Sequence, residues 1–147
     1  MSRHRAVTPA RIAADLTGAA ADLGYTLDQL HPGVRRPLIA PPGWDDLALA
    51  ASIRRALMIP QGTIAVAMRR HTSDVSAWEC GRAKTITPEM LTSYLSALVR
   101  AAEVREDRLT GKVRELAGIA RSEAAPGAWV DRLLDQVEAG AEGGRHA

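Results

Sequence analysis

Side chains with a chemical use gather in one stretch of this chain, residues 61–84. Thr72 and Ser73 carry hydroxyl groups, which both donate and accept hydrogen bonds and therefore suit the edges of DNA bases. Cations stand on both sides of these hydroxyls, at Arg69, Arg70, Arg82 and Lys84. Because arginine and lysine bind phosphate oxygens, this combination predicts a surface that contacts double-stranded DNA.

The apolar residues of the same stretch indicate which elements hold that surface. Their intervals fit two short helices with a break near position 69, and they are Ile64, Ala65, Met68, Val75 and Trp78. Ala65 is the key small residue, because helices that cross at a steep angle approach closely only where the side chain between them is small. The second helix then exposes short side chains that fit a major groove, namely Thr72, Ser73, Asp74, Ser76 and Ala77.

Residues 57–81 resemble, without a gap, the helix-turn-helix of the lambda-repressor-like family, also called Cro/cI or XRE. In that motif a glutamine opens the second helix, an apolar–alanine pair and a large apolar residue follow, and the recognition helix ends in Glu-x-Gly. The matching residues are Gln61, Ile64, Ala65, Met68, Val75, Trp78, Glu79 and Gly81. Family members often pair this glutamate with an arginine of the first helix, and Arg54 stands at that position.

The resemblance implies an all-α fold, with a five-helix lambda-repressor-like helix-turn-helix core, an N-terminal helical extension and C-terminal helices. It implies that bases are read by Arg70, His71, Thr72, Ser73 and Ala77. It implies phosphate contacts from Gln61, Arg69, Arg82 and Lys84. It also implies a structural ion pair between Arg54 and Glu79, which would close the first helix onto the third.

Some positions on this surface have two interpretations. Arg70 suits a guanine contact and a phosphate clamp equally well. Asp74 would accept from a cytosine amino group or cap its helix, and capping is favoured. Arginines outside the motif would reach a minor groove or remain solvated, and these are Arg3, Arg5, Arg35 and Arg36.

The turn between the two helices departs from the family pattern. Arg69 replaces the usual glycine at a position where the backbone is left-handed, which costs about 1 kcal/mol. Arg70 replaces a small or apolar residue, and His71 replaces the usual serine or threonine cap. Thr72 or Ser73 would take over the capping if the helix begins a residue or two later. Both arginines add positive charge beside the expected phosphates, which favours binding.

The composition narrows the class of protein. The 147 residues are 46% apolar but only 3% aromatic, with no phenylalanine, which favours helices over sheets. The N-terminus lacks the apolar run of a secretory signal, and no run is long enough to cross a membrane. The single cysteine, Cys80, forms no internal disulfide and indicates a reducing compartment. We therefore expect a cytoplasmic, nucleoid-associated protein without a membrane contact.

Catalytic and metal-binding patterns are weak in this chain. The histidines are too scattered along the sequence for a metal site, at His4, His31, His71 and His146. Gly62 stands alone rather than in a glycine-rich phosphate loop, and no nucleophile–base pattern stands out. We expect no enzymatic activity, no cofactor and no metal ion.

Helix-starting and helix-breaking residues divide the N-terminal part of the chain, residues 1–43. Thr8 and Pro9 predict the start of a helix whose apolar stripe ends at Gly24. Residues 31–43 form a Pro- and Gly-rich connector, too broken for a helix. This connector is expected to separate the N-terminal helix from the domain that follows.

Residues 44–102 are expected to form the DNA-binding domain. Asp45 would cap its first helix, because it precedes a strongly apolar helical pattern. Thr87 and Pro88 open its last helix in the same way. The surplus of cations over carboxylates lies in residues 1–100, which keeps this part of the chain suited to a polyanion.

The C-terminal region, residues 103–140, continues the helical pattern and opens a further amphipathic helix at Pro126, before an expected disordered tail at 141–147. Apolar residues recur at every seventh position, at Leu95, Ala102, Leu109 and Leu116. That face would pack onto the domain's own core or form a homodimer interface. The dimer is slightly favoured, because one recognition helix reads too few base pairs for useful specificity.

These patterns predict a sequence-specific DNA-binding transcriptional regulator, a repressor that binds an inverted repeat as a homodimer. The alternative hypothesis is a helical protein-interaction module, antitoxin-like or an adaptor, that keeps the tri-helical fold but binds a protein partner. The substitutions at Arg69 and Arg70 favour this alternative. Salt dependence separates the two, because binding through several phosphates weakens steeply as salt is added.

Overall fold

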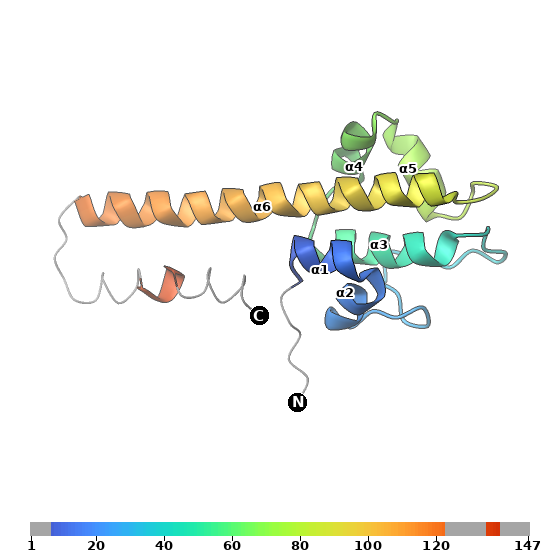
Figure 1. Ribbon diagram of the computed structural model, residues 1–147, viewed down its shortest axis with the longest axis horizontal. Coiled ribbons are helices and arrows are strands. Elements are labelled where there is room, and N and C mark those ends of the chain that lie inside the picture. Colours follow the sequence, from blue (N-terminus) through green and yellow to red (C-terminus); the bar gives the residue numbers. More distant parts are fainter. Residues whose placement is uncertain (1–6, 123–134, 139–147) are drawn as a thin grey trace. The chain divides into compact units, whose positions relative to one another are not determined.

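The structure, a computed structural model, describes residues 7–122 and 135–138, and all regular structure in these ranges is helical (Figure 1). The helices are α1 (Pro9–Ala14), α2 (Leu16–Asp22), α3 (Trp44–Ala56), α4 (Gln61–Met68), α5 (Thr72–Glu79) and α6 (Pro88–Ser122). Residues 135–138 are also helical. The prediction of an all-α fold is therefore confirmed for the described part of the chain. None of its helices is both long enough and apolar enough to span a bilayer.

The chain divides into two compact units, residues 1–102 and residues 103–147. The first unit holds α1 to α5 and the first part of α6. Between residues 44 and 102 there are four helices, so the five helices that the sequence predicted for this core are not all found there. Any five-helix core has to include a helix from the N-terminal segment.

Two short helices, rather than the predicted single one, form the start of the first unit. The Thr8 hydroxyl accepts from the Arg11 amide at 3.1 Å and caps α1, as predicted. The break falls at Asp15, whose backbone is extended and whose carboxylate accepts from the Gly18 amide at 3.0 Å. Asp15 therefore ends α1 and caps α2, and the predicted apolar stripe is shared between these two helices. Gly24, with φ of 89°, follows the end of α2.

The N-terminal helices pack onto α3, so residues 31–43 do not separate two pieces as the sequence predicted. Ala19 and Ala20 of α2 are fully buried in the same core as α3. The Pro- and Gly-rich segment is free of helix, as predicted, and its start is held by a hydrogen bond from the His31 amide to Ser52 Oγ at 3.2 Å. In Figure 1 the α1–α2 pair lies on one side of α3 and the α4–α5 pair on the other.

α3 begins without the predicted Asp45 cap. The helix starts one residue earlier, at Trp44, so Asp45 lies inside the first turn and pairs with Arg36 at 3.1 Å. Gly43 precedes the helix in a left-handed conformation, with φ of 82°. A Cβ atom at Gly43 would collide with the carbonyl oxygen of Ile86, so glycine is required where these two segments cross.

A three-residue turn joins α4 to α5. Arg69 adopts the left-handed conformation, with φ of 55° and ψ of 45°, so the backbone expected at this position is present with an arginine in place of glycine. α5 begins at Thr72, directly after His71, and the predicted late start does not occur. No capping hydrogen bond from His71, Ser73 or Asp74 closes the first turn, so the favoured capping role of Asp74 is wrong. Asp74 sits inside that turn, where its charge still complements the positive helix end.

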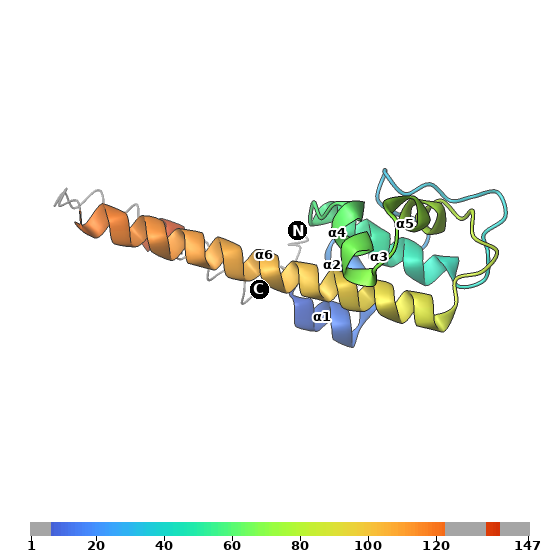
Figure 2. The ribbon, with the colours of Figure 1, turned by 90° about the horizontal axis from the view of Figure 1, so that it is seen from above.

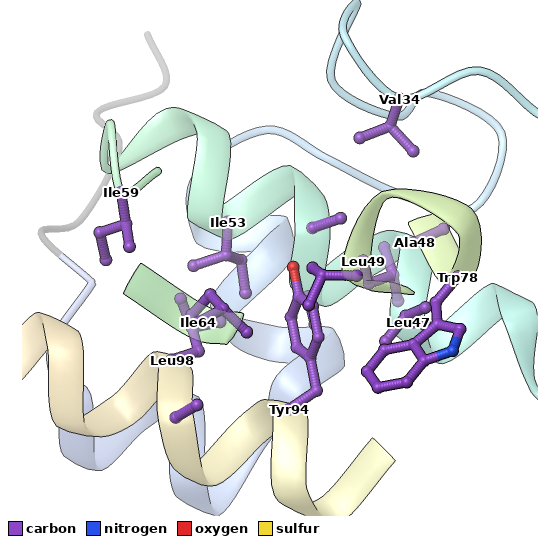
Figure 3. Packing of buried hydrophobic residues seen from close by; sticks show 14 of the residues in the cluster. Val34, Leu47, Ala48, Leu49, Ile53, Ile59, Ile64, Trp78, Tyr94 and Leu98 are labelled. Atoms are coloured by element: carbon purple, nitrogen blue, oxygen red, sulfur yellow. The ribbon is translucent and has the colours of Figure 1, made fainter. Parts of the chain in front are cut away.

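The core of the first unit lies between α3, α4, α5 and the first part of α6 (Figure 3). Ala65 is 2% exposed and Trp78 is 8% exposed, and Met68 packs against the same cluster, as their spacing predicted. Tyr94 and Leu98 of α6 are fully buried beside them. The small residue at 65 therefore lies where the helices approach, and the apolar face of α5 points inward.

α6 starts as predicted after Thr87, whose hydroxyl accepts from the Met90 amide at 3.2 Å. In the second unit, the leucines of the seven-residue pattern are half exposed, Leu109 at 56% and Leu116 at 50%. The helix predicted to open at Pro126 begins outside the described residues, and the predicted tail lies outside them as well.

His31 is a titratable group whose pKa the fold lowers. Its Nδ1 accepts a hydrogen bond from the Gly33 amide at 2.9 Å, which requires the neutral ring with its proton on Nε2. Burial lowers the pKa of His31 below the usual 6.5, and the charges of Arg55 and Arg54 lower it further. The folded state therefore binds a proton at His31 less readily than the unfolded chain does.

We expect the free energy of unfolding to depend on His31 as the pH falls. The contribution is fully present above pH 6.5 and is lost as the pH falls through the lower pKa of the folded state, because protonation then favours the unfolded chain. His31→Asn keeps an acceptor for the Gly33 amide without a titrating ring, and it should flatten the stability profile between neutral and mildly acidic pH. Urea unfolding at several pH values measures the free energy of unfolding of the wild type and of the variant. If the two free energies change with pH in parallel, His31 is not the titrating group.

Candidate nucleic-acid interface

A buried ion pair between Arg54 of α3 and Glu79 of α5 joins these two helices, as the family resemblance implied. Arg54 Nε and Nη2 donate to the two carboxylate oxygens of Glu79 at 2.9 and 2.7 Å. The side chains are only 5% and 4% exposed. Two parallel hydrogen bonds of this kind add geometric specificity to the charge attraction, so the pair sets how α5 lies on α3.

Neighbouring groups complete the hydrogen bonding of this pair. The Tyr94 hydroxyl donates to Glu79 Oε2 at 2.7 Å, and Figure 3 shows its ring reaching from α6 into the core. Gln61 Nε2, at the start of α4, donates to Glu79 Oε1 at 2.9 Å. Arg54 Nη1 donates to the Ile59 carbonyl at 2.7 Å. We call Arg54, Gln61, Glu79 and Tyr94 the buried ion cluster, and it connects α3, α4, α5 and α6.

The protonation states of the cluster suit its burial. Burial by itself would lower the pKa of Arg54, but the hydrogen bond to Glu79 and the neighbouring negative charge raise the pKa above its usual value. Burial raises the pKa of Tyr94 well above its usual value, and the charge of Glu79 adds to the rise. Tyr94 is therefore a neutral donor and Arg54 a permanent cation, and the cluster holds one matched pair of charges.

Two members of the cluster differ from the sequence prediction. The sequence placed Gln61 at a phosphate, yet its side-chain amide faces Glu79 within the protein. Tyr94 was not among the predicted site residues. A signal for it exists, because Tyr94 lies three residues after Leu91 and four before Leu98 and so shares their helix face. A tyrosine on a buried face needs a partner for its hydroxyl, and the buried carboxylate of Glu79 is such a partner.

The residues predicted to read bases lie together at the start of α5. His71, Thr72 and Ser73 are exposed, whereas Ala77, one turn further along, is half-buried. The first turns of α4 and α5 lie side by side, since a Cβ at Gly62 would be 3.8 Å from Thr72 Oγ1. The exposed hydroxyls thus project from a helix end that α4 supports.

Exposed cations surround this helix end, and they are Arg69, Arg70, Arg82 and Lys84. Arg70 lies over the ring of Trp78, with its guanidinium carbon 5.9 Å from the ring centre. The Arg82 amide donates to the Ala77 carbonyl at 2.9 Å, so the loop that carries Arg82 and Lys84 follows directly from the end of α5. Residues 61–84 hold two carboxylates, Asp74 and Glu79. Because Arg54 neutralises Glu79, only Asp74 offsets the four cations, and this surface remains positive.

Tyr94→Phe should lower the free energy of unfolding by about 1.5–3 kcal/mol, the usual contribution of a hydrogen bond to a charged group. The phenyl ring keeps the packing, but Glu79 Oε2 loses one of its two donors, the hydroxyl at 2.7 Å, and keeps only Arg54 Nε. Urea denaturation of the full chain measures the change. Tyr25→Phe is the matched control, since Tyr25 is only partly buried and its change is expected to stay within about 0.5 kcal/mol. Equal losses in the two variants would refute a special role for Tyr94.

Metal-ligating groups and reactive side chains outside this surface are the other candidates for chemistry among the described residues. Within residues 7–122 and 135–138, no three His, Cys, Asp or Glu side chains lie close enough to hold a metal ion together. Cys80 is exposed at the end of α5. Comparison of the chain with protein-family models, with curated proteins and with solved structures found no match to any of them.

Proposed function

We propose that this protein is a sequence-specific DNA-binding transcriptional regulator of the lambda-repressor-like kind. α4 and α5 form the helix-turn-helix, α5 enters the major groove, and α2 or α1 joins α3 to α6 in the five-helix core. The regulator represses transcription in the cytoplasm, at the nucleoid, by binding an inverted repeat in double-stranded DNA as a homodimer. It needs no cofactor, metal ion or catalytic residue for this function.

The observation that carries the proposal is the exposed start of α5 with its surrounding cations. His71, Thr72 and Ser73 are exposed on an element whose other face is held by the buried ion cluster. A rigid helix end with hydroxyls and an imidazole at its tip can form hydrogen bonds with base edges without reorganising. Arg70 sits at the edge of this tip, where it meets either a guanine or a phosphate.

Phosphate binding is assigned to both sides of the recognition helix. Arg69 and Arg70 precede it and Arg82 and Lys84 follow it, and all four are exposed. Gln61 takes part differently from the sequence prediction, because one of its side-chain N–H groups is used by Glu79. Its contribution to a phosphate comes from the remaining N–H and from the backbone amides that open α4.

Selection of bound sequences from random duplex DNA tests the proposal. A homodimer with one α5 per half-site should select a palindrome whose half-sites lie about one helical turn, roughly 34–36 Å, apart. The affinity for the selected duplex should also fall steeply between low and moderate salt. Failure to enrich any sequence, at a salt concentration where the chain is folded, would reject the proposal.

The alternative is a protein-interaction module, and one observation favours it. Two large apolar side chains near the helix-turn-helix are exposed, Met58 at 83% and Val66 at 79%. Exposed apolar side chains of this size offer contact area to a protein partner. Ser73→Arg separates the two functions. In a DNA-binding protein it should change the affinity for DNA or the sequence preference, whereas in an adaptor the affinity for the protein partner should stay the same.

A further inference from the structure

A cavity of about 430 Å³ opens beside the buried ion cluster, within the first unit. Its wall comes from the loop between α2 and α3, from α3, from the start of α4 and from α5. Figure 2 shows this loop passing alongside α5. The two are close together, because a Cβ at Gly81 would lie 2.5 Å from Pro37 Cγ. The volume falls in the range of small-molecule sites, about 300–1,000 Å³.

The lining of this cavity has an excess of positive charge. Three arginines and one carboxylate line it, namely Arg35, Arg36, Arg55 and Glu79. Glu79 is neutralised by Arg54, and Arg36 is bound to Asp45 at 3.1 Å. Arg35 and Arg55 have no acidic partner among the residues that the structure describes. Two positive charges therefore remain uncompensated in one concave site.

Arg55 is the more telling of the two cations. Its Nε is buried and has no hydrogen-bond partner in the described part of the chain. Its guanidinium lies directly under Gly33, where a Cβ atom would come within 2.5 Å of Nη1. A buried donor without an acceptor is costly, and the cost is greater for a charged group. An anion bound in the cavity, which Arg55 lines, would supply the negative charge that this guanidinium lacks.

The remaining lining residues indicate what else the ligand carries. Val34 and Pro37 offer apolar surface, while Ser76 of α5 offers a hydroxyl and Cys80, directly after α5, offers a thiol. An inorganic anion alone would leave most of the 430 Å³ to water. A compact organic body attached to the anionic group would contact the apolar side instead.

We propose that this cavity is a binding site for a small organic anion, a carboxylate or phosphate ester, whose charged group lies between Arg35 and Arg55. The site is separate from the exposed tip of α5 and does not depend on the proposed DNA-binding function. The ligand contacts α5 from the side of Ser76 and Cys80.

Alkylation of Cys80 measures occupancy without DNA, because Cys80 lines the cavity and is the only cysteine of the chain. The full-length protein is treated with iodoacetamide, an uncharged reagent, in the presence of phenyl phosphate, phenol or inorganic phosphate. Phenyl phosphate should slow the alkylation at least fivefold at saturation. Inorganic phosphate should require a higher concentration, and phenol should give no protection.

Substitutions of the two cations identify the site. Arg55→Gln should raise the phenyl phosphate concentration for half-protection at least tenfold, and Arg35→Gln should raise it several-fold. Arg100→Gln, which removes an exposed cation of α6 outside the cavity, should match the wild type. If Arg55→Gln fails to fold by circular dichroism, the exposed Arg35→Gln decides the matter. No protection of the wild type, or equal protection of wild type and arginine variants, would overturn the proposal.

Alkylation in the presence of an oligonucleotide duplex distinguishes a free small anion from a DNA phosphate with the same chemistry. If an oligonucleotide duplex protects Cys80 in an Arg55-dependent way while phenyl phosphate does not, the cavity receives the DNA backbone and the small-ligand proposal is wrong. If phenyl phosphate protects Cys80 and the duplex neither binds nor protects, the cavity proposal stands while the DNA-binding function fails.

Discussion

Replacing Glu79 with glutamine should lower the free energy of unfolding of the first unit by about 3–5 kcal/mol, because it leaves Arg54 charged and uncompensated in the interior. Glutamine still reaches the guanidinium but offers one acceptor oxygen and no negative charge, where the carboxylate accepts at 2.9 and 2.7 Å. Domains of this size have only about 5–15 kcal/mol of stability, so the loss is a large fraction of the total. Urea and thermal unfolding of the full chain measure it.

Asp45→Asn is the matched control for this prediction. This substitution also removes the carboxylate of an arginine ion pair, since Asp45 contacts Arg36 at 3.1 Å. The two side chains of that pair are, however, about half exposed, Arg36 at 46% and Asp45 at 53%. An exposed pair contributes about 0–1 kcal/mol, so the control should lose little. A combined Arg54→Leu, Glu79→Met and Tyr94→Phe variant should regain much of the stability, since it leaves no buried charge. If Glu79→Gln costs no more than Asp45→Asn, the buried ion cluster does not stabilise the fold as described.

The double substitution Arg70→Ala and Arg82→Ala should weaken binding to the selected duplex by at least roughly 100-fold at low salt. Each lost charge-assisted hydrogen bond is worth about 1.5 kcal/mol or more, and 1.4 kcal/mol is a factor of ten in affinity. The slope of log affinity against log salt should also become shallower by about 0.9 for each phosphate contact removed. Titration of labelled duplex at three or more salt concentrations gives both quantities.

Single variants show what each arginine does. Arg82→Ala should weaken binding to all sequences alike, because Arg82 is assigned to a phosphate. Arg70→Ala should relax the preference at one base pair if Arg70 meets a guanine, and should act like Arg82→Ala if it meets a phosphate. Arg100→Ala removes the same charge from an exposed position on α6 and should leave the affinity within twofold. A double variant that binds like Arg100→Ala would favour the protein-interaction module instead.

The two predictions concern different residues, Glu79 inside the core and two exposed arginines on either side of α5, and should be separable by experiment. Glu79 lies at the buried end of the helix, and the hydroxyls of Thr72 and Ser73 lie at its exposed start. A change at Glu79 should reduce stability first and DNA affinity only through unfolding. A change at Arg82, which is exposed, should reduce affinity with little change in stability.

The sequence by itself determined those features that depend on neighbours along the chain. Thr8 and Thr87 cap their helices, and the apolar spacing around Ala65 and Trp78 places the buried faces of α4 and α5. Capping and helical periodicity act within one or two turns, so residue types a few positions apart are sufficient to predict them. The Arg54–Glu79 pair spans 25 positions, and it was predicted from the family resemblance rather than from local pattern.

Only the tertiary structure decided which distant groups meet. It turned the Gln61 amide toward Glu79, brought the Tyr94 hydroxyl to the same carboxylate across 15 positions, and laid the N-terminal helices on α3. It also left Arg55 beneath Gly33 without an acid, which is what makes the cavity positive. These contacts form because all helices have to fill one core and give its buried polar groups hydrogen-bond partners at the same time. Residues that are close in the sequence do not determine how this condition is met, because it depends on the whole fold.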